Sequence, residues 1–305
     1  MYNRIAQNVR RTWLLMLVFS LLLMALAYAI GEATRWGWEV VFIGFALAVA
    51  VNLYGYYHSD RLTLALSGAR PVTKAEEPDF YNLVENTAIA AGLPTPAVYV
   101  IEDSAPNAFA TGRDPQHSAI VATRGLLDKL QKVELEGVVA HEMSHVKNYD
   151  IRLMTIAVIL AGMVVLVSDL FLRWTFWGGA GRRRERGGGQ AQVILLVMAL
   201  VLAILAPLAA TLLRLAISRR REFLADADGA LLTRYPEGLA RALEKLDADE
   251  EPLEAANKAT AHLYIVSPLK GHPAHGRLAL LFDTHPPIEE RVAALRSMME
   301  PETRG

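Results

Sequence analysis

Residues 133–148 read VELEGVVAHEMSHVKN, and no other stretch says more about the fold of this chain. Leu135, Val138 and Val139 recur at the spacing of one helical face, which predicts a helix with an apolar side. A polar sequence with two histidines follows directly on this apolar stripe, so the same helix presents the candidate chemistry of the chain.

The sequence His141-Glu142-Met143-Ser144-His145 places two imidazoles four residues apart. On a helix these positions lie on one face, so both rings can reach one metal ion, with Glu142 about 100° around the helix beside them. A shuffled sequence of this composition contains such a motif in roughly 1% of cases. The motif alone therefore leaves open the alternative that both histidines simply pack on a helix.

The residues around this helix predict a small domain of mixed α and β structure. Helical spacing that starts at Asp79 stops at Gly92 before Pro94, as at the end of a helix. Short runs of strand-forming residues follow, separated by turn formers, and the C-terminal part is mainly helical. The expected elements are helices over 79–92, 125–131 and 133–148 and strands over 98–101, 108–111 and 118–123.

The composition excludes several classes of protein. The 305 residues carry 31 Lys and Arg against 32 Asp and Glu, a net charge of -1, so charge gives no reason to expect a nucleic-acid partner. Cysteine is absent, which excludes a disulfide scaffold, a thiol nucleophile and a cysteine-based zinc site. Any metal site must therefore use His, Asp and Glu.

Apolar residues make up 53% of the sequence and gather in four long runs, which indicates membrane spans. A bilayer core about 30 Å thick needs roughly 20 helical residues, and each run is long enough to cross with little tilt. The third run is also compatible with a core helix of a soluble domain, because charged residues flank it. The four runs are 13–30, 40–57, 153–172 and 193–213.

Basic residues beside the runs predict the orientation of the chain in the membrane. Three arginines precede the first run and three basic residues follow the second, whereas the loop between these runs holds one arginine. The N-terminus and the segment after the second run are therefore expected in the cytoplasm, with the protein in the inner or plasma membrane. Five arginines between the third and fourth runs go against the rule if those runs form a full hairpin.

The four runs divide the chain into four parts. The soluble parts lie on one side of the membrane under either orientation, because two runs separate them, and together they have the size of one domain. We expect a two-span anchor at 1–58, the first part of the soluble domain at 59–150, a membrane hairpin at 151–217 and the second part of the soluble domain at 218–305.

A catalytic zinc site needs three protein ligands and one open position, and Glu222 is the strongest candidate for the third ligand. It follows the fourth run, so a hairpin of the third and fourth runs can return it to the two histidines. Asp226, one helical turn on, can accept the free N–H of a ligating imidazole, that of His141 first of all. The alternative is that both carboxylates pair with Arg219–Arg221 on an exposed helix face. Asp150 is a further candidate for capping the motif helix or for bonding a ligand.

Several stretches together resemble the HtpX-type membrane zinc metallopeptidases, which are grouped with the CAAX-prenyl-protease-like peptidases. The likeness covers nearly the whole chain, because the order of the motifs and the four apolar runs match as well. Ser144 stands where one pattern of the family has Gly, a departure that touches neither a ligand nor the base. The stretches that carry the resemblance are Asn107–Gly112, His141–His145, Ser218–Asp226 and 284–287 with Arg291.

The resemblance implies a mainly helical α+β membrane protein with about four transmembrane helices. Its cytoplasmic domain would be a gluzincin-like zinc peptidase with a small sheet and one zinc ion per subunit. The resemblance further implies that His141, His145 and Glu222 ligate zinc and that Glu142 is the general base.

Other roles are also implied by the resemblance, each beside a plainer alternative. Asn107, Ala108, Phe109 and Ala110 would lie along the substrate groove, where an edge strand binds an extended peptide through its main chain. The alternative is an ordinary sheet edge with Phe109 in the core.

Two residues would lie near the reacting carbonyl, namely His285 and Arg291. For His285 the alternative is a loop histidine before a Pro-Pro turn. Arg291 could equally be a helix charge that pairs with Glu289 or Glu290.

The expected function is that of a zinc-dependent endopeptidase of the membrane, with protein or peptide substrates and the lipid bilayer as partners and no nucleic acid. The resemblance implies quality control under stress, in which misfolded or damaged membrane proteins are cut at the cytoplasmic face. One alternative is a prenyl-protein processing peptidase, for which four spans are few. Another is a non-catalytic zinc-binding membrane scaffold, and Glu142 argues against it.

Overall fold

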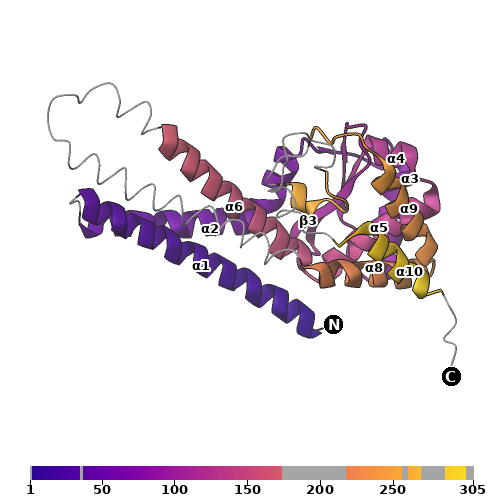
Figure 1. Cartoon of the computed structure of the whole chain (residues 1–305), viewed down its shortest axis with the longest axis horizontal. Helices are drawn as coiled ribbons and strands as arrows, with labels where there is room; N and C mark the ends of the chain where they lie inside the picture. The colour runs from indigo at the N-terminus through magenta and orange to yellow at the C-terminus, as the bar shows by residue number, and fades with distance from the viewer. Residues whose placement is uncertain (1, 35–36, 174–217, 256–259, 269–285, 300–305) are drawn as a thin grey trace.

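In the computed structural model, three long helices form an elongated arm and the remaining elements form a rounded domain at one end of it (Figure 1). The arm consists of α1 (Tyr2–Thr34), α2 (Trp38–Leu66) and α6 (Asp150–Arg173). The beginning of α1 lies beside the domain, and the helix then runs away from it. The structure describes residues 2–34, 37–173, 218–255, 260–268 and 286–299.

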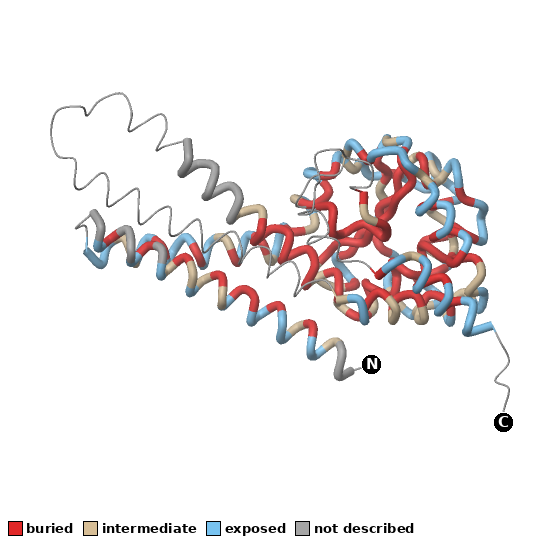
Figure 2. Tube along the Cα trace, in the orientation of Figure 1, coloured by how far each residue is buried: buried red, intermediate tan, exposed pale blue. Residues whose placement is uncertain are grey.

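Two helices of the arm are long and apolar enough to cross a membrane, namely Ile5–Ala25 within α1 and Trp38–Leu66, which is α2. Large apolar side chains such as Trp13 and Phe42 are exposed along both. Figure 2 shows exposed residues along much of the arm. These two helices contain the predicted runs 13–30 and 40–57 almost entirely.

The third run, 153–172, lies within α6, and its first part is buried. Residues 153–161 pack against α1 and α2 on one side and against the domain on the other (Figure 2). The fourth run, 193–213, lies outside the described residues. The number of spans therefore stays a prediction.

A four-stranded mixed sheet with the order β1-β2-β4-β3 forms one part of the domain. β2 and β4 are parallel, whereas β1–β2 and β3–β4 are antiparallel. β3 is at an edge of the sheet and has an irregular register with β4 between Gly112 and Asp114. The φ of 140° at Gly112 and the nearby carbonyl of His117 leave no room for a side chain there. The strands are β1 (Arg70–Pro71), β2 (Ala97–Ile101), β3 (Ala108–Asp114) and β4 (His117–Thr123).

The helices of the domain begin and end at residues suited to these positions. α3 has Pro78 in its first turn and is closed by Gly92 at φ 70°. At the start of α5, the side chain of Glu134 accepts a hydrogen bond from the backbone N–H of Gln131. The helices are α3 (Pro78–Ala91), α4 (Arg124–Lys129), α5 (Lys132–Lys147), α8 (Arg219–Thr233), α9 (Pro236–Ala248) and α10 (Ile288–Ser297), with a 3-10 turn η2 (Ala261–Leu263).

The motif helix α5 lies in the middle of the domain and is buried along almost its whole length. It packs against α8 and α9 and also against β3, so that residues from both halves of the sequence meet on its surface (Figure 1). Gly229 of α8 permits a close approach, because a Cβ there would be 3.0 Å from the backbone nitrogen of His141. This contact brings the first turns of α8 to the two histidines.

The prediction of a mainly helical α+β protein with a small sheet is confirmed, and all six predicted elements of the soluble part form. Their ends shift by at most three residues, most clearly in β3, which runs to Asp114 instead of Thr111. The two-residue strand β1 was not predicted, because Arg70-Pro71 carries no strand pattern.

Candidate metal centre

Three buried side chains of α5 and α8 meet at one point, each with a possible ligand atom turned inward. The Nε2 atoms of His141 and His145 are 3.2 Å apart, and each lies 3.7 Å from a carboxylate oxygen of Glu222. Ligand atoms about 2.1 Å from one ion at tetrahedral angles are themselves roughly 3.4 Å apart. The three side chains therefore fit one metal ion.

The first histidine is held by a carboxylate and a guanidinium, a group of residues that we call the Asp226 arm. Nδ1 of His141 is 2.9 Å from Oδ1 of Asp226. Arg291, which is fully buried, donates to both oxygens of Asp226 at 2.7 and 2.8 Å and to the carbonyl of Ile265 at 2.9 Å. With Nδ1 engaged in this way, Nε2 of His141 is left for the metal position.

The second histidine is held differently, by residues that we call the Asp150 arm. Nδ1 of His145 is 3.3 Å from Oδ2 of Asp150, the first residue of α6. The other oxygen of Asp150 accepts a hydrogen bond of 2.7 Å from the amide of Asn8 and lies 3.6 Å from Nε of Arg221. Again Nε2 of the imidazole is left for the metal position.

Burial determines the direction of the pKa shift for two groups at this centre. It raises the pKa of Glu142 to about 7, against the opposing effects of His145 and of a hydrogen bond from the backbone of Ala110. It also lowers the pKa of His141, against the hydrogen bond to Asp226. Glu142 can therefore gain and lose a proton near neutral pH.

Two groups keep their charge in spite of burial. Burial opposes the charged form of His145, but the hydrogen bond to Asp150 and the charge of Glu222 outweigh it and raise the pKa of His145 to about 9. Burial likewise opposes ionised Asp226, but Arg291 holds the pKa of that carboxyl below its usual value. Metal binding requires neutral imidazoles, so a bound divalent cation competes with the proton on His145.

The predicted substrate-groove residues lie next to the centre but are buried. Phe109 is in the core, with its ring edge-on to Tyr264 at 5.0 Å. The carbonyl of Ala108 accepts a hydrogen bond from the N–H of Ile265, and the amide of Asn107 donates to Val266. Residues 264–266 therefore occupy the first part of the β3 edge.

The remaining predicted residues have two different outcomes. Arg291 pairs with Asp226 inside the domain, so its partner is neither Glu289 nor Glu290. His285 lies outside the described residues.

Sequence reasoning missed the amide of Asn8, because no motif connects residues so far apart in the chain, although Asp150 was singled out.

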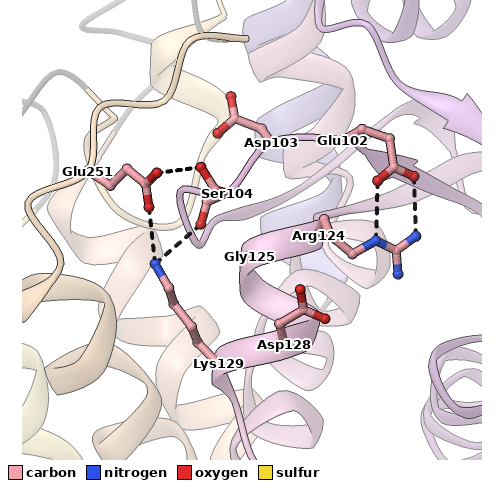
Figure 3. Close-up of a pocket in the computed structure, with 8 residues that line it drawn as sticks. All are labelled: Glu102, Asp103, Ser104, Arg124, Gly125, Asp128, Lys129 and Glu251. Carbon is pink, nitrogen blue, oxygen red and sulfur yellow. Dashed lines mark hydrogen bonds and ion pairs between the residues drawn. The ribbon is translucent and has the colours of Figure 1, made fainter.

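A separate surface pocket lies away from the metal centre (Figure 3). Its charges pair among themselves: Lys129 bridges Glu251 and the carbonyl of Ser104, and Arg124 pairs with Glu102. These contacts fasten the chain after α9 to the loop before β3. The pocket is lined by Glu102, Asp103, Ser104, Arg124, Gly125, Asp128, Lys129 and Glu251.

Comparison with known proteins agrees with this arrangement. Residues 74–299 match the model of a family described as Peptidase family M48. This chain belongs to peptidase family M48. As a member of family M48 it is a metallopeptidase, an enzyme that hydrolyses peptide bonds in peptides or proteins, and the helices of its arm fit a membrane protein.

Curated relatives support the membership in family M48 over the full length of the chain. A "Protease HtpX homolog" of Dictyoglomus thermophilum is 48% identical over 98% of this chain and 95% of its own length. Proteins of the same description in Thermoanaerobacter pseudethanolicus and Streptococcus gordonii are each 44% identical over 98% of this chain. The matches cover 98% of the length of the T. pseudethanolicus protein and 100% of that of the S. gordonii protein. The predicted resemblance to HtpX-type peptidases is confirmed.

Among solved structures, the crystal structure of Ste24p from S. mikatae aligns with 93% of this chain at a TM-score of 0.47 and 22% identity. The chain spans 66% of that protein. The family assignment comes from the sequence matches.

Proposed function

We propose that this protein is a zinc-dependent endopeptidase that cuts misfolded or damaged membrane proteins at the cytoplasmic face of the cell membrane. The observation that carries the proposal is the buried group of His141, His145 and Glu222, with the carboxylate of Glu142 beside it. Two imidazoles and one carboxylate form the donor set of many catalytic zinc sites, and the chain has no cysteine to form a closed structural site.

The proposed roles follow from the contacts of each side chain. When bound, zinc supplies a Lewis acid that polarises the scissile carbonyl and activates water. Glu142, whose carboxylate is buried beside the candidate ligands, takes the proton of the attacking water and passes it to the departing amine. Asp226 and Asp150 keep the Nδ1 proton on the two imidazoles, so that Nε2 carries the lone pair.

Other residues contact the substrate directly or support the metal centre through a neighbouring side chain. We place the substrate groove along Asn107–Ala110, with the carbonyl of Ala108 already engaged by Ile265. We assign His285 a hydrogen bond to the carbonyl oxygen of the scissile bond. Arg291 acts through Asp226, whose negative charge it balances inside the domain.

The membrane arrangement completes the proposal. α1 and α2 span the bilayer, and residues 151–217 form a second membrane hairpin that begins with α6. The soluble parts, 59–150 and 218–305, then form one peptidase domain on the cytoplasmic side. This side gives the active site access to the cytoplasmic segments of other membrane proteins.

The test is cleavage by the detergent-purified, metal-stripped protein with and without added zinc. The substrates are a membrane protein with a destabilised cytoplasmic domain, its stable parent and a prenylated peptide. We expect zinc-dependent cleavage of the destabilised protein, at least 100-fold slower in Glu142→Gln, which removes the proton acceptor but no ligand.

The matched control is Glu134→Gln, the same substitution two turns earlier on α5, where the carboxylate pairs with Lys245 away from the metal position. This variant should cleave at a rate close to that of the wild type. Cleavage of the prenylated peptide alone would favour the processing peptidase instead. Stoichiometric zinc without cleavage of any substrate would favour the scaffold.

A further inference from the structure

We propose that Asn8, near the start of the first membrane helix, is a positioning residue of the metal centre that acts on His145 through Asp150. The inference rests on the proposed function, because it takes His145 as a metal ligand. Asn8 lies five residues before the apolar run that starts at Trp13, in the first part of α1. The beginning of this helix lies beside the peptidase domain (Figure 1).

The contacts form one continuous path from the membrane helix to the imidazole. The amide nitrogen of Asn8 donates to Oδ1 of Asp150 at 2.7 Å, and Oδ2 of the same carboxylate is 3.3 Å from Nδ1 of His145. All three side chains are at least nine-tenths buried. Water is therefore a poor substitute for any of these hydrogen bonds, and each partner constrains the next.

The orientation of the Asn8 amide is determined by its neighbours. Its nitrogen donates to the carboxylate of Asp150 and also to the backbone carbonyl of Asn148 at 2.9 Å. Both neighbours only accept hydrogen bonds, so the NH2 group, and not the amide oxygen, must face them. Both N–H bonds of Asn8 are then used, and the amide has a single orientation.

The second acceptor shows that Asn8 also holds the backbone from which Asp150 projects. Asn148 ends α5, and its carbonyl is one of those at a helix end that lack a partner within the helix. Tyr149 follows with φ 59°, a left-handed conformation that costs free energy in a residue other than glycine. The amide of Asn8 donates one hydrogen bond to the carbonyl of Asn148, before Tyr149, and another to the carboxylate of Asp150, after it. The two hydrogen bonds together fix the direction in which Asp150 points.

A comparison within the arm separates this role from ordinary helix packing. Asn52 of α2 is also a buried asparagine, and its amide also donates to α1, to the carbonyl of Met16 and the hydroxyl of Ser20. Neither partner touches the metal centre. Asn52 therefore joins the two helices only, and it serves as the matched control for Asn8.

The experiment measures zinc binding by full-length, metal-stripped protein in detergent, in competition with a chromophoric chelator. Two variants are used: Asn8→Ala removes the side chain, and Asn8→Leu keeps its bulk and favours the helix but lacks both donors. We expect zinc affinity to fall roughly 3- to 10-fold in both, less than the 10- to 100-fold typical for groups that bond a ligand directly.

Three further measurements show whether the effect passes through Asp150. Asn52→Ala should bind zinc as the wild type does. Asn8→Leu should change the visible absorption spectrum of the cobalt-substituted protein, which reports ligand geometry, whereas Asn52→Ala should not. In Asp150→Ala, the additional change Asn8→Leu should lower zinc affinity no further.

The outcomes distinguish this inference from the proposed function. A wild-type protein that binds no zinc overturns the proposed function and the inference together. Wild-type affinity in Asn8→Leu, an equal loss in Asn52→Ala, or full additivity with Asp150→Ala overturns the inference alone. A loss that is confined to Asn8 and absent in the Asp150→Ala background supports it.

Discussion

The two histidines of the metal centre are held by arms of different construction. The Asp226 arm lies wholly inside the peptidase domain and ends in Arg291, whose guanidinium contacts both carboxylate oxygens at 2.7 and 2.8 Å. The Asp150 arm has a longer contact to its imidazole, 3.3 Å, and its carboxylate is bonded by the neutral amide of Asn8 on a membrane helix, with Nε of Arg221 3.6 Å away. A short bidentate contact to a guanidinium is stronger and more rigid than one amide contact beside a more distant guanidinium. The Asp226 arm is thus the firm attachment, and the Asp150 arm links the metal centre to the membrane part.

The largest effect should come from breaking the charged end of the Asp226 arm. Arg291→Leu leaves Asp226 ionised and buried with His141 as its remaining partner, which we expect to cost about 3–5 kcal/mol of folding free energy. Thermal unfolding of the metal-free protein in detergent measures the loss. Arg296→Leu on the same helix is the control, since its pairs with Glu237 and Glu244 are exposed to solvent and should contribute little to stability. Equal losses of folding free energy in Arg291→Leu and Arg296→Leu would contradict a special role for the buried contact between Arg291 and Asp226.

A smaller effect should follow from neutralising each carboxylate in turn. Asp226→Asn and Asp150→Asn each remove the charge that holds an imidazole, and zinc affinity should fall roughly 10- to 100-fold in each. We expect the larger loss in Asp226→Asn, because that change also removes both short contacts of buried Arg291 and leaves it only the carboxylate of Glu222 at 3.9 Å. The measurement is chelator competition on both variants. A larger loss in Asp150→Asn would reverse the order of the two arms.

The smallest effect depends on the protonation of the two histidines, which differs between the two arms. The pKa of His145 is raised to about 9 and that of His141 is lowered, so at pH 7.5 metal-free His145 holds an extra proton and His141 does not. Zinc must displace that one proton. Zinc affinity should therefore rise with pH, about tenfold per unit until pH passes the pKa of His145, and then level off.

Calorimetry in buffers of different ionisation enthalpy counts the released protons. Near pH 7.5 we expect about one proton per zinc for the wild type and fewer for Asp150→Asn, in which the hydrogen bond that raises the pKa of His145 loses its charge. Unchanged proton release in Asp150→Asn would show that His145 is not the group that titrates.

The sequence predicted the parts of the centre that depend on local spacing. Helical periodicity put His141 and His145 on one face, and the same periodicity placed Asp226 one turn after Glu222 on α8. The strands 98–101, 108–111 and 118–123 followed from residue type and turn formers. In each case neighbouring residues carry the information, because hydrogen bonds within one helix or one hairpin determine the geometry.

Other contacts between distant elements escaped prediction for a physical reason, whereas the approach of Glu222 and Asp226 to His141 was expected. An arginine on a short helix next to two glutamates has close partners in sequence, and only the packing of α10 on α8 turns Arg291 to Asp226 instead. Likewise, an apolar run such as 153–172 has the same composition whether lipid or protein covers it. The burial of residues 153–161 results from the docking of α6 on the domain, which no periodicity reveals.

The position of Arg291 in the chain has a consequence for the order of biosynthesis. The ribosome makes the motif helix α5 first and then α6, whereas α8 with Glu222 and α10 with Arg291 come later. Two of the three candidate ligands therefore exist before the third, and the guanidinium that balances Asp226 is made after all of them. A growing chain that already contains His141 and His145 therefore lacks the third candidate ligand, and it can complete the Asp226 arm only after Arg291 has been made.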